Sequence, residues 1–325
     1  MDERNPEMTP RIDGAPAVSV VIPCKGNPEA LVWLLRDVLA QALDRSFEVI
    51  VVDAWSDDTI KAAAEAEGAR VVRQGSGHLP GAARNLGANA AQGEVLVFVD
   101  ADCRVQPGWL AAAVATLESG ARLATGPVAD LTPRHPIARA DNLLQFADLP
   151  PERPAGTLHM APSCNIAIHA EDFANLGGFQ HREGLATGED VDFCERLTAL
   201  WPEGIRFNPQ MQVRHAGRRT IAGMIRHHHA FGYSRGKLRL LLTDRQVRLA
   251  GMAVMAPAVV LRRLIYIFGR VTALSPLKLP ATALVSPFLL IGAAAWTVGF
   301  RKGLHEVDPP PRQGKASVMH GNLNK

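Results

Sequence analysis

The sequence has few cysteines and almost no excess of charge of either sign. Its four cysteines are far apart and form no Cys-x-x-Cys pair, which argues against both a zinc site and a framework of disulfides. The 35 basic residues against 32 acidic ones leave a net charge of only +3, which gives no global electrostatic footprint for nucleic acid. We therefore expect a protein of a reducing compartment that binds no nucleic acid.

The first residues lack an apolar stretch that could serve as a secretory signal. Met1–Arg11 carries charges of both signs and two prolines instead. We expect a disordered tail over residues 1–17 and a second one over 306–325. The chain between them is long enough to bury one large α/β domain with an appendage, or two modest domains.

Long apolar runs are confined to the C-terminal part. Ala281–Phe300 has no charged residue and is long enough to cross a bilayer as one helix. Leu249–Leu261 is shorter and meets Arg262 and Arg263, which suits a helix at an anionic membrane surface or one limb of a hairpin. We expect membrane-associated or transmembrane helices over 236–305, with a buried pair of core helices as the soluble alternative.

The N-terminal part alternates short apolar runs with helical stretches, which is typical of a parallel sheet covered by helices. The expected strands are Val18–Ile22, Glu48–Val52, Arg70–Val72 and Glu94–Val99, and the expected helices lie near Glu29–Ala40, Asp58–Glu67 and Gly81–Ala91. Ligands bind beyond the carboxyl ends of the strands in such sheets. Asp53, Asp100 and Asp102 therefore lie where a site is expected.

Asp100 and Asp102 are two residues apart where a buried strand gives way to a turn. Both carboxylates can face one hard cation there, which suits Mg²⁺ or Mn²⁺ bound by one or two carboxylates together with substrate phosphates. An Asp-x-Asp run also occurs often in solvated turns. The position directly after a buried strand favours the metal interpretation.

Asp53 ends the second expected strand. A carboxylate at this place can accept a hydrogen bond from an imide N–H, which uracil, thymine and guanine present and cytosine and adenine do not. The position of Asp53 therefore predicts a contact with a nucleotide base. The alternative is that Asp53 has only a structural role in a turn.

Three further places carry groups that could take part in chemistry. Glu189 and Asp190 open a helix, where they either complement the helix dipole or supply a general base. Arg84 either approaches phosphates or decorates a helix. His215 is either a third metal ligand or a structural histidine.

Taken together, these residues resemble the family 2 glycosyltransferases with the GT-A fold. The resemblance covers about 18–219 and rests on Val20–Pro23, Val49–Asp53 with Ser56 and Asp58, Ala83–Gly87, Val97–Asp102, Asn165, Gly177–Phe179 and Gly188–Asp190. The order and spacing of the set are specific, although each member alone is weak. The resemblance implies a Rossmann-like, mostly parallel sheet flanked by helices, in a domain that we place at 18–235.

The resemblance also implies roles for these residues. Pro23, Asp53, Arg84, Asp100 and Ala101 would bind a nucleotide sugar, with a UDP-sugar favoured over GDP- or dTDP-sugars. Asp102 and His215 would hold Mg²⁺ or Mn²⁺ on the diphosphate. Asp190 would be the general base, with Glu189 and Asn165 on the acceptor side. The implied reaction inverts the anomeric carbon, because a deprotonated hydroxyl displaces the nucleoside diphosphate in line.

Two departures from the family pattern refine this expectation. Ala54-Trp55 stands where many relatives have an acidic residue and a glycine, which weakens the base contacts near Asp53. The Gln-x-x-Arg-Trp sequence of processive synthases is replaced by Gln212–His215, so transfer of a single sugar is expected.

The membrane-associated helices predict where such an enzyme would work. We expect a lipid or lipid-linked acceptor at the inner (cytoplasmic) membrane, with the catalytic domain facing the cytosol. A non-catalytic, nucleotide-binding membrane scaffold of the same fold is the alternative, and the intact Asp100, Asp102 and Asp190 argue against it.

Overall fold

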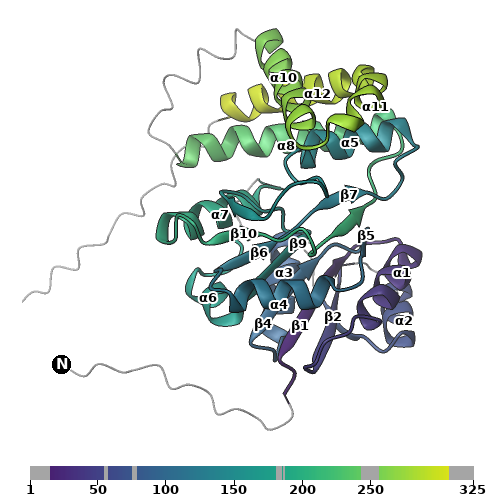
Figure 1. The fold of residues 1–325 in the computed structure, drawn as a ribbon, viewed down its shortest axis with the longest axis vertical. Coiled ribbons are helices and arrows are strands. Elements are labelled where there is room, and N and C mark those ends of the chain that lie inside the picture. The colour runs from purple at the N-terminus through teal and green to yellow at the C-terminus, as the bar shows by residue number, and fades with distance from the viewer. Residues whose placement is uncertain are drawn as a thin grey trace, which may run out of the picture.

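A twisted sheet flanked by helices forms one end of the molecule, and a layer of helices forms the other (Figure 1). The computed structural model describes residues 15–54, 58–74, 79–180, 185, 187–242 and 256–306. The two expected tails therefore lie almost entirely outside the described residues.

The central sheet has eight strands. Their order is β3 (Arg70–Arg73), β2 (Phe47–Asp53), β1 (Val18–Cys24), β4 (Val95–Val99), β9 (Asn165–His169), β6 (Leu123–Thr125), β10 (Ile205–Phe207) and β8 (Gly156–Leu158). The four expected strands are confirmed as β1 to β4, and they run parallel. The sheet is mixed rather than purely parallel, because β9 runs antiparallel to both β4 and β6, and β8 runs antiparallel to β10.

Helices cover the two faces of this sheet (Figure 1). They are α1 (Pro28–Leu39), α2 (Thr59–Ala66), α3 (Pro80–Ala90), α4 (Trp109–Glu118), α6 (Ala170–Asn175) and α7 (Glu189–Leu200), of which α1 to α3 confirm the expected helices. The cap residue Asn27 accepts a hydrogen bond from the Ala30 N–H, and Pro28 takes the first helical position. Helix α3 lies close to β1, since a Cβ on Gly87 would be 2.3 Å from Val21 Cγ1.

A small second sheet consists of β5 (Cys103–Val105), β11 (Val213–His215) and β7 (Val128–Asp130). Strand β11 is antiparallel to β5, with His215 opposite Cys103. The backbone N–H of Ala216 donates to the carbonyl of Asp102 at 3.0 Å. This pairing places His215 beside the Asp100-Ala101-Asp102 turn, although more than a hundred residues separate them in the sequence.

The helical layer contains α5 (Pro136–Phe146), α8 (Ile221–Leu242), α10 (Ala256–Leu274), α11 (Leu279–Leu284) and α12 (Ser286–His305), with a 3₁₀ turn at Pro276–Lys278 (Figure 1). The backbones of α8 and α12 touch: a Cβ on Gly232 would lie 1.9 Å from the carbonyl oxygen of Trp296. Apolar side chains of α5, α8, α10 and α12 share one cluster. The domain boundary that we expected after residue 235 falls inside α8.

The structure corrects the expected straight membrane helix over Ala281–Phe300. Helix α11 ends at Leu284, α12 begins at Ser286, and the two segments Pro276–Leu284 and Ser286–His305 are bent by 78°. The break has a local cause, since Pro287 has no N–H to offer the carbonyl of Ala283. Among the described residues, no single helix combines the length and apolarity of a membrane span, whereas this bent pair passes by length and composition. Residues 249–255 of the shorter apolar run lie outside the described part of the chain.

Candidate active site

A cleft opens at the carboxyl ends of β1, β2 and β4. It holds about 360 Å³ and is lined by, among others, Pro23, Ala54, Arg84, Asp100, Ala101 and Asp102. The structure thus brings together five of the residues expected to bind a nucleotide sugar or its metal. Asp53 lies at the end of β2 directly before Ala54, 1% exposed, and its Oδ2 is 3.7 Å from Arg73 Nε.

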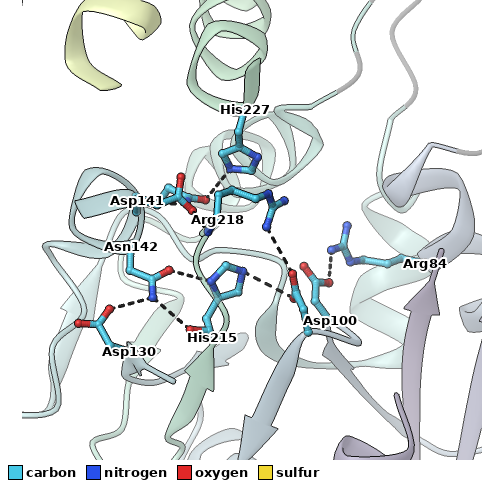
Figure 2. Close-up of polar contacts among 10 residues, drawn as sticks. Arg84, Asp100, Asp130, Asp141, Asn142, His215, Arg218 and His227 are labelled. Carbon is cyan, nitrogen blue, oxygen red and sulfur yellow. Dashed lines mark hydrogen bonds and ion pairs between the residues drawn. The ribbon is translucent and has the colours of Figure 1, made fainter. Parts of the chain in front are cut away.

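Arg84 connects the cleft to α7. Its guanidinium is buried, donating to Asp100 Oδ1 at 2.5 Å and to Glu189 Oε1 at 2.9 Å (Figure 2 shows the first contact). Burial lowers the pKa of Arg84, but Asp100 and Glu189 raise it by more, so the side chain remains cationic. Arg84 is therefore not a residue of the exposed helix surface, and its contact with phosphates stays a prediction.

His215 faces Asp102 across a short gap. Its Nε2 lies 3.6 Å from Asp102 Oδ1, which is too long for a hydrogen bond. On the other side of the ring, Nδ1 is 2.8 Å from Asn142 Oδ1 (Figure 2). The Asn142 amide nitrogen donates to Asp130 Oδ1 and to the His215 carbonyl. Since both acceptors fix the orientation of the amide, Oδ1 accepts the proton of His215 Nδ1, and Nε2 is the ring atom that faces Asp102.

This arrangement fits a divalent ion. Asp102 Oδ1 is shielded from solvent and has no hydrogen-bond partner among the described residues, and a His215 ring with its single proton on Nδ1 would offer Nε2 as a second ligand atom. Neighbouring ligands in an octahedral shell with bonds of about 2.1 Å lie about 3 Å apart, so a 3.6 Å separation needs only a small adjustment. The described residues hold no group of three or more His, Cys, Asp or Glu suited to a metal, so the remaining ligands would be substrate phosphates and water.

Asp190 and Glu189 open α7 after Gly188, whose φ of 99° is left-handed. Asp190 is half-buried, and its Oδ1 accepts a hydrogen bond from the Val191 N–H at 2.8 Å. Burial raises the pKa of Asp190, and Asp100 adds to this, against the opposing effects of Arg235 and Arg84. Glu189 lines a small recess beside the main cleft, whereas Asp190 lines neither cavity. A raised pKa suits a general base, and its role stays a prediction.

The structure corrects the placement of Asn165 on the acceptor side. This residue of β9 is fully buried, and its Oδ1 accepts from Trp109 Nε1 at 2.9 Å. Its amide nitrogen donates to the carbonyls of Met211 and Pro127. Asn165 therefore fixes loops beneath the site, because its side chain has no atom left to face an acceptor.

Three residues that sequence reasoning missed surround His215 and Asp102. Arg218 lines the cleft with its Nη1 3.6 Å from Asp102 Oδ2, and its backbone N–H donates to Asp141 Oδ2 at 2.9 Å (Figure 2). Asp141 precedes Asn142 on α5, so two adjacent residues hold Arg218 and His215. Arg218 could have been found from the sequence, because it is a cation only three residues after His215. Nothing local pointed to Asp141 or Asn142.

Three consecutive histidines, His227–His229, lie on α8, where the sequence alone predicts an interfacial or acceptor-facing helix segment. Instead, His228 is 1% exposed, with Nε2 3.0 Å from Asp141 Oδ1, and His227 Nε2 is 3.1 Å from Gln145 Oε1. Burial lowers the pKa of His227 to about 3, and Arg218 adds to this effect. The two rings are therefore contacts between α8 and α5.

Comparison with known proteins decides the family. The model of glycosyl transferase family 2 matches residues 19–176. An uncharacterized glycosyltransferase of Mycobacterium tuberculosis, Rv0539, is 36% identical over 221 residues, which make up 65% of this chain and 92% of that protein. The chain belongs to glycosyltransferase family 2. The pre-mycofactocin glycosyltransferase of the same species is 30% identical over 253 residues, 74% of this chain, and this family 2 chain spans about half (51%) of that relative.

Solved structures confirm a GT-A-like fold for this family 2 glycosyltransferase. The mannosyltransferase PcManGT from Pyrobaculum calidifontis, in complex with GDP-Man and Mn²⁺, aligns with a TM-score of 0.58 and 19% identity, over 90% of this chain and 88% of that one. TarS residues 1–349 from S. aureus align with a TM-score of 0.50 and 15% identity, over 88% of this chain and 91% of that one.

Proposed function

We propose that this chain transfers one sugar from a nucleoside-diphosphate sugar to an acceptor hydroxyl, with inversion and with Mg²⁺ or Mn²⁺ on the diphosphate. The observation that carries the proposal is the pair of potential ligand atoms, Asp102 Oδ1 and His215 Nε2, 3.6 Å apart beside a cleft that Asp102 and Ala54 line. The cleft lies within the usual size range of small-molecule sites.

The donor would lie between β2 and the Asp100-Ala101-Asp102 turn. Pro23, Ala101 and the end of β2 at Asp53 are on the base and ribose side, and an imide N–H favours a UDP-sugar, with GDP- and dTDP-sugars as alternatives. The mannosyltransferase of similar fold was solved with GDP-Man, which keeps a GDP-sugar among the donors to test.

The described residues divide the reaction between them. Asp190 takes the proton of the acceptor hydroxyl, whose oxygen attacks the anomeric carbon as the bond to the diphosphate breaks. Arg84 holds Asp100 and Glu189 in fixed positions, and Arg218 presents a cation on the diphosphate side of the cleft. A divalent ion at Asp102 and His215 would neutralise the charge of the leaving diphosphate.

The acceptor is proposed to be a lipid or lipid-linked molecule at the inner (cytoplasmic) membrane, with the sheet domain in the cytosol. Support comes from exposed apolar side chains of the helical layer, of which Leu277 and Leu284 are 96% and 80% exposed. The replaced Gln-x-x-Arg-Trp sequence supports transfer of a single sugar. A nucleotide-binding scaffold without catalysis is the second candidate.

A donor screen followed by one substitution tests the proposal. Thermal shift with Mn²⁺ present should identify a stabilising nucleotide sugar, and radiolabelled transfer with that donor should then be measured for Asp190→Asn and for the control Glu195→Gln, an exposed residue of the same helix. We expect Asp190→Asn to lower transfer about 10²- to 10⁴-fold with unchanged donor binding. Full activity of Asp190→Asn would remove its role as base, and donor binding without any turnover in the parent would support the scaffold.

A further inference from the structure

The outer side of α10, the 3₁₀ turn, α11 and α12 forms an exposed apolar face. Of the twelve large apolar side chains that are exposed among the described residues, seven lie on this stretch. They are Leu261, Ile265, Tyr266, Leu277, Leu284, Leu290 and Val298. Figure 1 shows these helices together at the end of the molecule farthest from β1 and β4. We call this surface the outer face. A concentration of this kind marks an interaction site, because soluble proteins rarely expose contiguous apolar patches.

The helices of the outer face carry charges of one sign. From Arg245 to His305 the sequence contains no Asp or Glu, but eight Arg and Lys residues. Two acidic residues that follow α5 lie beside these helices, and each is paired with a cation: Asp148 with Arg270 and Glu152 with Lys278. Arg262 and Arg301 are exposed at the outer face itself. An apolar surface with exposed cations, next to which the carboxylates Asp148 and Glu152 are already paired with cations, complements an anionic lipid surface.

The same charge pattern argues against a second copy of the chain as the partner. A twofold dimer would bring the same patch of both copies together. Arg262 and Arg301 of one copy would then approach those of the other, with no acidic residue from the layer between them. Juxtaposed like charges in an interface are costly.

We propose that the outer face docks on an anionic bilayer, with α10, α11 and α12 lying in the interfacial region rather than crossing the membrane. The 78° bend at Val285 supports docking, since neither arm of the bent pair passes the length and composition of a span by itself. Leu277 and Leu284, close to the bend, are the most exposed of the seven and would insert deepest. This inference rests on the proposed function, in which the acceptor lies at a membrane, and it identifies the surface of the protein that would contact that membrane.

Docking would also orient the catalytic helix. Helix α8 packs along α12, and its Leu238 covers Gly188, where a Cβ would lie 2.5 Å from Leu238 Cδ1. Leu238 shares a small apolar cluster with Leu185 and Val191. The face on the bilayer is thus joined through α8 to the start of α7, where Asp190 lies. A lipid-linked hydroxyl would approach from this side.

Flotation with vesicles tests the docking. The full chain is mixed with vesicles of phosphatidylcholine alone or with phosphatidylglycerol, at low and at raised salt, and floated on a density gradient. We expect the parent to float with the anionic vesicles, less with the neutral ones and less at raised salt. The double variant Leu277→Glu/Leu284→Glu should partition at least about tenfold less.

A matched control replaces two apolar residues that are exposed on the sheet domain, Leu39→Glu/Leu200→Glu, and should float like the parent. Thermal melting and donor binding of all variants check the fold separately from transfer, so a failure of docking leaves the proposed chemistry untouched. The proposal is overturned if the parent does not float, if the double variant floats like the parent, or if the control loses as much. A dimer in solution that the double variant dissociates would assign the face to a second copy instead.

Discussion

The surfaces of the sheet domain and of the helical layer differ in the charged residues that they carry. The sheet domain covers itself with charges of both signs, as in the pairs Arg36–Glu67 and Arg45–Glu118. The helical layer has no acidic residue of its own from Arg245 to His305, and its inward cations are paired with Asp148 and Glu152 after α5. The mixed charges of the sheet domain suit contact with water. The excess of cations on the helical layer suits a partner that carries no positive charge.

The two regions also differ in how they reach tight packing. Strands β1, β2 and β4 bury large side chains against their covering helices, with a close approach at Gly87. Helices α8 and α12 contact each other through several glycines: a Cβ on Gly232, Gly299 or Gly303 would lie within 2.2 Å of a carbonyl oxygen of the facing helix. The candidate site depends on both kinds of packing, because α5 holds His215 and Arg218, and His228 of α8 contacts Asp141 of α5.

The largest effect should come from the sheet domain. Asp102→Ala removes one of the two potential ligand atoms, and we expect transfer to fall about 10³-fold as stabilisation of the leaving group is lost. Mn²⁺ binding, followed by electron paramagnetic resonance, should weaken in parallel. Asp44→Ala, whose side chain is 90% exposed, is the control. Undiminished Mn²⁺ binding in Asp102→Ala would contradict the metal site.

A substitution on α5 tests whether the helical layer contributes to the site. Asn142→Leu removes the acceptor of His215 Nδ1–H, so the ring is free to turn, and we expect Mn²⁺ affinity to fall about 10- to 100-fold. Gln145→Leu, three residues along the same helix, breaks a contact with His227 and should leave Mn²⁺ affinity unchanged. Equal losses in both variants would indicate general damage to α5.

Two glycine-to-alanine substitutions in the helical layer test its packing, because one should disrupt the packing and the other should not. Gly232→Ala forces α8 and α12 apart, and we expect a loss of about 1–3 kcal/mol in the free energy of unfolding. Gly269→Ala adds a methyl group where nothing lies within 4 Å, and should be neutral or gain up to about 1 kcal/mol through helix propensity. Chemical denaturation of both variants measures the difference, and equal stabilities would contradict the close approach of α8 and α12.

The smallest effect concerns pH. Because burial raises the pKa of Asp190, this carboxyl group contributes stability below its unfolded-state pKa, and that stability is lost as pH rises through the folded-state pKa. Transfer should show the opposite dependence and fall as pH drops, since the base must be ionised. The melting temperature of Asp190→Asn should therefore be slightly higher than that of the parent at neutral pH, and the difference should disappear at acidic pH. A constant gap across this range would contradict the raised pKa.

Local patterns were sufficient to predict the strands and the polar residues that line the cleft at their ends. Runs such as Val95–Val99 followed by Asp100 predict both a buried strand and the polar residues at its end, because each depends only on neighbours in the sequence. Contacts between distant segments were out of reach. Asn142 meets His215 and Asp141 meets His228 across more than seventy residues. Asn165 was misplaced because its partners Trp109 and Met211 are also distant, at 56 and 46 residues.

The arrangement of the helical layer was not predicted from the sequence, for another reason. Counting apolar residues over Ala281–Phe300 gave a single span, but the count ignores the missing N–H of Pro287 and therefore the break at Val285. The expected membrane-associated helices suggested a boundary after residue 235. Helix α8, Ile221–Leu242, crosses this point without interruption.

The continuity of α8 limits how the chain can be divided. A protease or a truncation that cut after Arg235 would leave the sheet domain without Leu238, and Gly188 beside Asp190 would lose its cover. A cut after Leu242 would keep Leu238, but Gly232 and Gly236 would lose the backbone of α12 against which they pack. A catalytic fragment trimmed for solubility at either point would carry a defect at its active site or along its last helix.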